Sequence, residues 1–358
     1  MTALEIVQRR LRNQRLTRSE FRKPADVVAW LGAVQAQEYS PAKWAIGLRA
    51  NGITDADVEQ AFNTGALLRT HFLRPTWHFV ARPDIRWMLA LSAPRLHAVN
   101  AYYYRKFEVD SRLTARTRIL LERALRDGHE RTRTELATTL RRAGIAVDGI
   151  RLAYLMMHAE LDAVICSGPR RGNQFTYALF EERVPPAPTL TRNEALAELT
   201  RRYFSSRGPA TVHDFVWWSG LTVREAKIGL EEAKAGLKEH RIDGRSHWFV
   251  ESGAPHRSVS GSVYFLPTYD EFGIGYKDRS AVPSIPRPRG IAATREFAHL
   301  LLVGRQLVGR WKRTVKPTTL LIEIQPFRSL NRREKRALAA EAERQGRFMN
   351  VSVKLSCV

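Results

Sequence analysis

The sequence is poor in cysteine and has no long hydrophobic run. Its 358 residues include only two cysteines, Cys166 and Cys357, which lie far apart. No group of cysteines and histidines has the spacing of a zinc site, so we expect a reducing compartment and no metal or other cofactor. No run approaches the roughly 18 apolar residues that a membrane helix needs. These absences predict a cytoplasmic protein that does not span a membrane.

Acidic residues are scarce relative to basic ones. The chain has 58 lysines and arginines against 36 aspartates and glutamates, which gives a net charge of +22. The basic residues are dispersed along the whole length, and such an excess is typical of proteins that bind polyanions. Nucleic acid is the first candidate and an anionic membrane surface the second. We therefore expect the protein to associate with the nucleoid.

The length fits two or three domains rather than one core. In the first part, Pro24 opens a helix with apolar residues at helical spacing, and Thr54 with Asp57 caps another. Residues 66–80 then form two β-like runs, which break at Arg74-Pro75. Together with an initial helix from residue 3, this order predicts a winged helix-turn-helix, in which helices pack a small core and a hairpin forms the wing.

The same order of helices and hairpin can be read in residues 113–179, with a turn at 168–173. Repetition of one unit favours an array of similar modules over a single elaborate fold. The proline-rich residues 184–188 make the clearest linker. A third, strand-rich part follows, and Asn331 with Glu334 caps its last amphipathic helix.

Two glutamines, Gln35 and Gln37, lie where the second helix is expected to end. On an intact helix, residues two apart point about 200° apart, so the pair can share a target only if the backbone becomes extended. Pro41 disfavours the helical conformation of Ser40 and supplies a reason for that change. The alternative is two solvated glutamines in a helical end, which the spacing alone favours.

The glutamine pair, together with Arg74-Pro75-Thr76 and the segments at 217–221, 266–272 and 276–279, resembles the AlkZ-like DNA glycosylases over nearly the whole length. The signature of that family is a glutamine-any-glutamine motif, matched here by Gln35 and Gln37. A sister branch has aspartate at the second position, where this chain has Gln37.

The resemblance implies a mainly α member of the α+β class, with three tandem winged helix-turn-helix modules in a C-shape around duplex DNA. We expect module 1 at 1–95, module 2 at 96–184, and module 3 at 185–358 with a β-rich extension and a C-terminal helix. The implied activity is a DNA glycosylase that acts on double-stranded DNA with cationic alkylated purines such as N7-alkylguanine. A lysine nucleophile is not apparent, so we expect a monofunctional enzyme, and we expect it to be a monomer. Bulky adducts and interstrand crosslinks belong to the same class of substrate.

Alkylation puts a positive charge on the purine and weakens its glycosidic bond, so a strong acid is not needed. The remaining task is to hold a water and to stabilise positive charge on the sugar, which amide carbonyls can perform. Gln35 and Gln37 are therefore the predicted catalytic residues. Glu38 is the alternative general base, although a plain surface carboxylate is the simpler interpretation.

The DNA-binding residues are expected to be basic side chains in and around a predicted hairpin at 301–313. In the resembled family a hairpin of the third module approaches the minor groove, and the alternative here is an ordinary wing with solvated charges. The predicted DNA-binding set comprises Arg74, Lys277, Arg279, Arg305, Arg310, Lys312 and Arg313.

Four further residues are assigned structural roles. Asp270 and Glu271 follow an apolar strand end, and with Lys277 and Arg279 downstream they are expected to form an ion-pair cluster. His71 and His78 flank the bend of the first wing and are expected to be satisfied structural histidines.

Two other functions fit the same charge and helices. One is a winged-helix transcription regulator, and the other is a non-enzymatic protein that shields damaged DNA. No effector domain is recognisable, and regulators commonly carry one such module per protomer rather than three.

Overall fold

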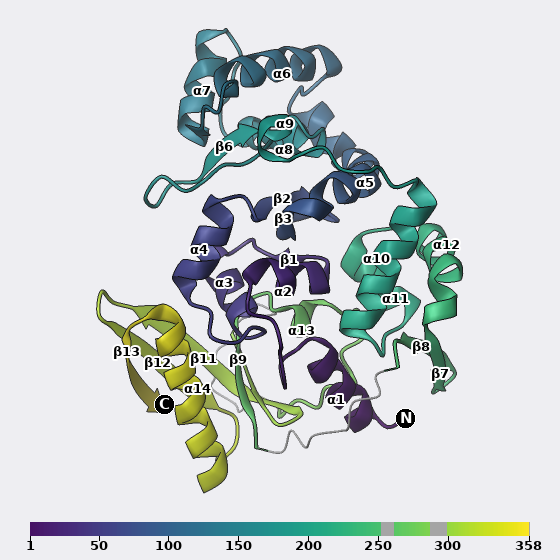
Figure 1. Ribbon diagram of the computed structural model, residues 1–358, viewed down its shortest axis with the longest axis vertical. Helices are drawn as coiled ribbons and strands as arrows, with labels where there is room; N and C mark the ends of the chain where they lie inside the picture. The colour runs from purple at the N-terminus through teal and green to yellow at the C-terminus, as the bar shows by residue number, and fades with distance from the viewer. Residues whose placement is uncertain (252–260, 287–298, 358) are drawn as a thin grey trace.

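The computed structural model describes residues 1–251, 261–286 and 299–357, and it contains both helices and antiparallel sheets (Figure 1). The predicted α+β composition is confirmed. After α1 (Ala3–Asn13), a helix, a short strand, two helices and a hairpin follow one another twice, and the same order occurs a third time with an isolated bridge in place of the short strand. Among the described helices, none is long and apolar enough to cross a membrane.

The first unit places its short strand beside the hairpin, in a sheet of order β1-β3-β2. All its pairings are antiparallel. Its elements are α2 (Pro24–Leu31), β1 (Val34–Gln35), α3 (Tyr39–Gly47), α4 (Asp55–Asn63), β2 (Leu67–Phe72) and β3 (Arg74–Ala81).

The second unit has the same arrangement, with a sheet of order β4-β6-β5. The long helix α5 (Ile85–Lys106) leads into it from the first unit, and α9 (Phe180–Arg183) follows it. Its elements are α6 (Ser111–Leu125), β4 (Arg131–Thr132), α7 (Arg133–Arg142), α8 (Arg151–Leu161), β5 (Ile165–Ser167) and β6 (Thr176–Leu179).

The third unit repeats the order in a reduced form. An isolated bridge between Ala210 and Trp248 stands where the other units have their short strand. Its elements are α10 (Arg192–Arg207), α11 (Val212–Ser219), α12 (Val223–Ala233), β7 (Lys238–Ile242) and β8 (Arg245–Phe249).

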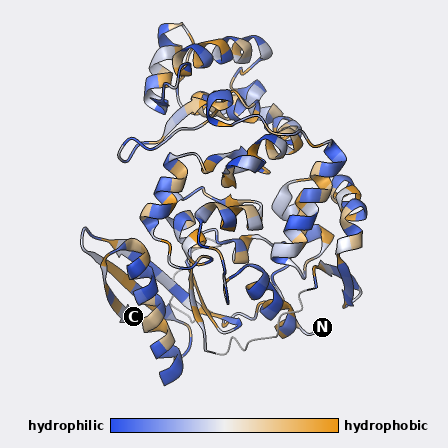
Figure 2. Ribbon diagram, in the orientation of Figure 1, coloured by the Kyte–Doolittle hydropathy of each residue, from blue (hydrophilic) through white to orange (hydrophobic). Residues whose placement is uncertain are grey.

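A five-stranded sheet of order β13-β12-β11-β10-β9 completes the chain. The final helix, α14, connects β12 to β13, which pair in parallel, and it packs on the sheet. Hydrophilic and hydrophobic residues alternate along α14, as expected for a helix with one buried face (Figure 2). The elements are β9 (Val263–Leu266), α13 (Glu271–Ile274), β10 (Leu300–Val303), β11 (Gln306–Val315), β12 (Thr319–Pro326), α14 (Arg332–Met349) and β13 (Ser352–Cys357).

The predicted helix starts are confirmed. Thr2 and Thr54 each form a capping box with an acidic residue three positions later, and Asn331 does the same with Glu334. Each cap satisfies backbone N–H groups that the helix leaves unpaired and contributes about 1 kcal/mol. Local sequence therefore determines where these helices begin.

The first unit packs against each of its neighbours. Its Trp44 is fully buried, and the centroid of its ring lies 5.2 Å from that of Phe348 of α14. The indole N–H of Trp44 donates a hydrogen bond to the carbonyl of Phe265. A Cβ on Gly47 would lie 2.6 Å from the Phe348 ring, so this approach of α3 to α14 requires glycine. Its Phe72 joins a second core with Trp218 of the third unit. The first unit therefore packs on both the third unit and the elements of the five-stranded sheet.

Candidate active site

Gln35 lies on an extended segment and Gln37 in the bend that follows it, and neither residue belongs to a helix. α2 ends at Leu31, and Gly32 reverses the chain with a φ of 76°. Gln35 then belongs to β1, and the backbone N–H of Ala36 still donates to the carbonyl of Trp77 on β3. The predicted extension is confirmed. Its expected cause is wrong, because the helix ends at the glycine and Pro41 lies in the first turn of α3.

The two glutamine side chains contact Arg74 and Thr76, which lie on one face of β3 because alternate residues of a strand share a face. Two residues of β3 bind their carbonyl oxygens. Arg74 donates from Nη2 to Gln35 Oε1 over 2.9 Å, and the Thr76 hydroxyl donates to Gln37 Oε1. A carbonyl oxygen has two lone pairs, so each amide keeps one acceptor site. Each of the two carbonyls is therefore oriented by a hydrogen bond from β3.

The two glutamines differ in exposure. Gln35 is half-buried, whereas Gln37 is exposed. Glu38 is half-buried and stands at the N-cap position of α3, where its side chain makes no capping hydrogen bond. Gln37 is thus the member of the pair that a molecule from solvent meets first.

A buried carboxylate holds the backbone of Gln35. Oε1 of Glu271 accepts from the Gln35 N–H over 2.9 Å, and its Oε2 accepts from Arg207 and from the indole of Trp218. Glu271 and the Arg207 side chain are fully buried. The backbone of the candidate site is therefore fixed by α10, α11 and α13, which lie far along the chain.

Asp270 forms a separate buried pair with Arg49, whose two terminal nitrogens each lie 2.8 Å from one carboxylate oxygen. The predicted ion-pair cluster around Asp270 and Glu271 is confirmed. Its predicted partners are wrong, because Arg49 and Arg207 occupy those positions rather than the two basic residues at 277 and 279.

The histidines of the first wing have partners within the fold. His78, directly opposite Gln35 in the sheet, is fully buried, and burial together with the nearby Arg74 lowers its pKa well below the usual value. Its Nδ1 lies 3.0 Å from the carbonyl of Thr76, which only a protonated Nδ1 can bind. His71 contacts Glu160 through Nδ1 over 2.5 Å. His78 is therefore a neutral side chain with a fixed tautomer.

Two arginines give the site a positive surrounding. Burial lowers the pKa of Arg74, and it lowers the pKa of Arg69 to about 10, which leaves Arg69 charged at neutral pH. Arg69 donates to the carbonyl of Ala36, between the two glutamines, and its guanidinium lies 4.1 Å from the Trp77 ring. The sequence analysis did not assign Arg69, Arg207 and Glu271 to this site. The available signal was their charge, because a charged side chain that becomes buried needs a partner.

The predicted hairpin at 301–313 exists as β10 and β11, with a turn at Gly304 and Arg305. Its basic residues do not gather at the tip, because β11 has ten residues and a strand rises about 3.3 Å per residue. Arg305 approaches Gln8 of α1, and Arg310 lies 5.6 Å from the Phe327 ring.

Two residues of the same strand lie farther from the tip. Lys312 pairs with Glu323 over 2.8 Å. Arg313 donates to the Ser40 hydroxyl over 2.8 Å, and burial lowers its pKa. Of the remaining predicted residues, Lys277 is exposed and Arg279 is half-buried. Arg74 and Arg313 thus lie beside the glutamine segment, whereas Arg305 lies against α1.

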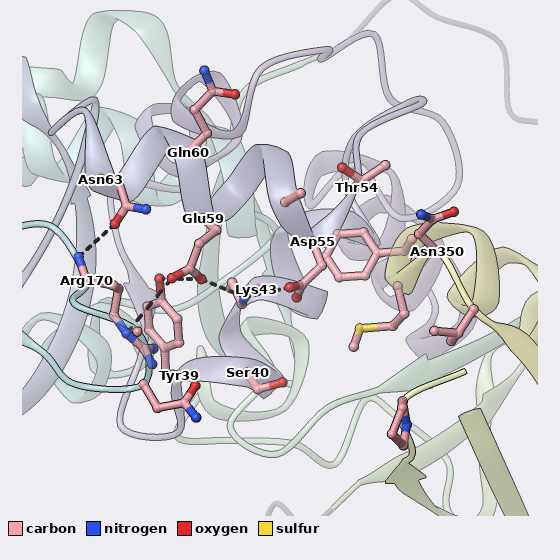
Figure 3. A pocket seen from close by; sticks show the side chains of 17 residues that line it. Tyr39, Ser40, Lys43, Thr54, Asp55, Glu59, Gln60, Asn63, Arg170 and Asn350 are labelled. Atoms are coloured by element: carbon pink, nitrogen blue, oxygen red, sulfur yellow. Dashed lines mark hydrogen bonds and ion pairs between the residues drawn. The ribbon is translucent and has the colours of Figure 1, made fainter. Parts of the chain in front are cut away.

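A cavity of about 930 Å³ begins two residues beyond Gln37 and extends along α3 and α4 (Figure 3). Lys43 reaches into it and contacts Asp55 over 2.7 Å and Glu59 over 2.8 Å. The Tyr39 hydroxyl donates to Glu59, and the Arg170 guanidinium lies 5.0 Å from the Tyr39 ring. The charges of this cavity are therefore largely paired with one another.

A comparison with protein families gives the class of the protein. The model of the AlkZ-like DNA glycosylase family matches residues 28–348, and the chain belongs to that family. It is a DNA glycosylase, and the family implies that it binds DNA.

Two comparisons with particular proteins agree with the family. An interstrand DNA cross-link repair glycosylase of Streptomyces sahachiroi is 24% identical over 351 residues, which cover 92% of this chain and 91% of that protein. The solved structure of the Streptomyces sahachiroi DNA glycosylase AlkZ is similar with a TM-score of 0.79 and 21% identity, and it covers all of both chains. The second comparison shows a shared fold.

Proposed function

We propose that the protein is a monofunctional glycosylase that hydrolyses the N-glycosidic bond of cationic alkylated purines, in DNA repair or self-resistance. N7-alkylguanine is the simplest such substrate. The observation that carries the proposal is the segment on which Gln35 and Gln37 present oriented carbonyls. The cross-link repair glycosylase of Streptomyces sahachiroi supports extending the class to bulky adducts and interstrand crosslinks.

The free acceptor sites of the two amides would hold the attacking water through its hydrogens. Their dipoles would also stabilise positive charge as it develops on the sugar. Arg74 and Thr76 serve as positioning residues, because each fixes one carbonyl. An amide takes up no proton at neutral pH, so Glu38, the next residue, remains the alternative base.

A monofunctional reaction fits the contacts of Lys43, the lysine nearest to the segment along the sequence. A lysine nucleophile must present a free amine to the sugar. Lys43 instead directs Nζ at Asp55 and Glu59 in the adjoining cavity (Figure 3). Water is therefore the proposed nucleophile.

The three repeated units are proposed to be winged-helix modules at 1–95, 96–184 and 185–358, arranged as a C around duplex DNA. The repeated helix, strand, helix, helix and hairpin supports this assignment, as does the charge of +22. The proposed DNA surface includes Lys277, Arg279 and the basic residues of β11 with its turn. We propose that the protein works as a monomer on DNA of the nucleoid.

The activity is tested with duplex DNA that carries one N7-methylguanine or one bulky N7 adduct. Hot alkali cleaves the strand at an abasic site, so protein-dependent scission after alkali is the expected result. Scission without alkali would reveal lyase activity. Specific binding without scission would instead support a transcription regulator or a lesion-shielding protein.

A duplex with uracil is the matched control, because an uncharged base needs an acid that the site lacks, and its efficient release would contradict the mechanism.

A further inference from the structure

A cluster of two histidines and one carboxylate lies where α5 packs on α8, in a part of the fold that the proposed chemistry does not use. His97 belongs to α5, His158 to the last turn of α8, and Asp162 is the C-cap residue of α8. Nε2 of His97 lies 2.9 Å from Asp162 Oδ1, and Nδ1 of His158 lies 3.2 Å from Asp162 Oδ2. One atom from each side chain lies within 4.8 Å of the other two.

We propose that these three residues bind a divalent transition-metal ion, with Zn²⁺ as the preferred ion. Imidazole nitrogens and a carboxylate are ligands that suit zinc, and metal–ligand distances of about 2.0–2.2 Å require only small rotations of side chains already this close. Three protein ligands leave a fourth, tetrahedral position for water.

The surroundings allow an ion to enter. The side chains of His97 and His158 are 27% and 21% exposed, and that of Asp162 is 41% exposed. A cavity of about 380 Å³ lies beside the cluster, and His97 and Asp162 contribute to its wall. The fourth ligand therefore has room on the side that faces this cavity.

Tyr104 supplies the outer hydrogen bond that histidine ligands of metals usually make. Its hydroxyl lies 3.0 Å from Nδ1 of His97. When Nε2 of His97 carries the proton toward Asp162, the hydroxyl donates to Nδ1. When Nε2 binds a metal, the proton moves to Nδ1 and the hydroxyl accepts it, which a hydroxyl can do because it both donates and accepts. The same side chain thus supports both the empty and the occupied site.

The position of the cluster gives the ion a structural role. α5 leads from the first unit into the second, and Pro94 removes one hydrogen bond from it just before His97. An ion that joins His97 to α8 would fasten the second unit to this helix. It would add stability by mass action, because it binds the folded chain and finds no preformed site in the unfolded one.

The test uses the full chain without a polyhistidine tag, stripped with EDTA and titrated with Zn²⁺ in a calorimeter. One equivalent of ion is expected, with a higher midpoint of thermal unfolding and an intense visible spectrum when Co²⁺ replaces Zn²⁺. His158→Ala and Asp162→Asn should abolish this binding, and Tyr104→Phe should weaken it about 10- to 100-fold. His129→Ala is the matched control, since this exposed histidine of the same unit bonds to a backbone carbonyl.

The absence of saturable Zn²⁺ binding by the wild-type chain would overturn the proposal, as would equal binding by wild type and His158→Ala. Unfolding of each variant in EDTA shows whether it folds. Tyr104→Phe removes only a hydroxyl and keeps the test valid if a ligand variant is unstable. The readout is metal binding, so failure here leaves the proposed glycosylase activity untouched.

Discussion

The backbone N–H of Gln35 donates a 2.9 Å hydrogen bond to Oε1 of Glu271, which lies 236 residues later in the chain. The other carboxylate oxygen binds Arg207 and Trp218, so one buried side chain joins β1 to α10 and α11. The position of the glutamine segment therefore depends on the third unit as well as on its own sheet. Changes at Glu271 should affect both stability and activity.

Glu271→Gln keeps an acceptor for the Gln35 N–H but leaves the buried guanidinium of Arg207 without a counter-charge. Removing one partner of a buried ion pair costs about 3–5 kcal/mol, so the free energy of unfolding in urea should fall by roughly that amount. Asp278→Asn is the control, because its pair with Arg245 is mostly exposed and should cost less than about 1 kcal/mol. Equal, small losses in both variants would show that Glu271 is not a structural link.

Gln35→Ala and Gln37→Ala should each lower the single-turnover excision rate by about tenfold or more, while the affinity for lesion DNA stays nearly unchanged. The reason is that each variant removes one carbonyl that holds the water. Gln37 is exposed, so Gln37→Ala should change the free energy of unfolding by no more than about 0.5 kcal/mol. Rates and binding are measured on the same N7-methylguanine duplex.

Gln60→Ala is the matched control for the glutamine variants. Gln60 is an exposed glutamine of α4 that lines the adjoining cavity (Figure 3). Its loss should leave the excision rate unchanged. Wild-type rates in both the Gln35 and the Gln37 variant would exclude the proposed placement of water.

Replacing Arg305, Arg310, Lys312 and Arg313 together by alanine should flatten the dependence of DNA affinity on salt. Each lost phosphate contact lowers the slope of log K against log salt by about 0.9. Lys312→Ala alone should change the slope least, because Glu323 already binds this ammonium. Affinities are measured over a series of salt concentrations. An unchanged slope in the quadruple variant would place the DNA surface on other elements.

Features set by neighbouring residues could be predicted from the sequence. The capping boxes, the hairpin turn at Gly304 and the repeated order of elements all depend on residues a few positions apart. The extension at Gln35 followed only from the assumption that the two glutamines share a target, because their spacing alone favours a helical end. Its cause was assigned wrongly to Pro41, since proline is as acceptable in the first turn of a helix as after its end.

Features set by distant residues could not be predicted. Asp270 pairs with Arg49 and Glu271 with Arg207, in both cases across a large separation in sequence. Closeness in sequence instead favours Lys277 and Arg279 as partners. The His97 cluster could not be predicted for the same reason, because His97 lies 65 residues from Asp162, and the local pair of His158 and Asp162 does not indicate a metal site by itself. Only the packing of helices brings such charges together.

Glu341 should make stability depend on pH. This carboxyl of α14 is 7% exposed, and burial raises its pKa from 4.5 to about 7, against a weaker opposing effect of Arg344. A raised pKa means that the folded protein holds the proton more tightly than the unfolded chain. The group therefore costs no stability below about pH 4.5, and stability falls as the pH rises to about 7. At higher pH the buried charge lowers the free energy of unfolding by its full amount, about 3 kcal/mol.

Glu341→Gln removes this ionisation, so the variant should exceed the wild type in free energy of unfolding at pH 8. The difference should shrink as the pH falls and vanish well below pH 4.5, because there the wild-type carboxyl is protonated in both states. Urea unfolding at a series of pH values measures it. Glu343→Gln, an exposed change on the same helix, should show no comparable trend. A stabilisation by Glu341→Gln that stays constant with pH would mean that burial of charge is not its cause.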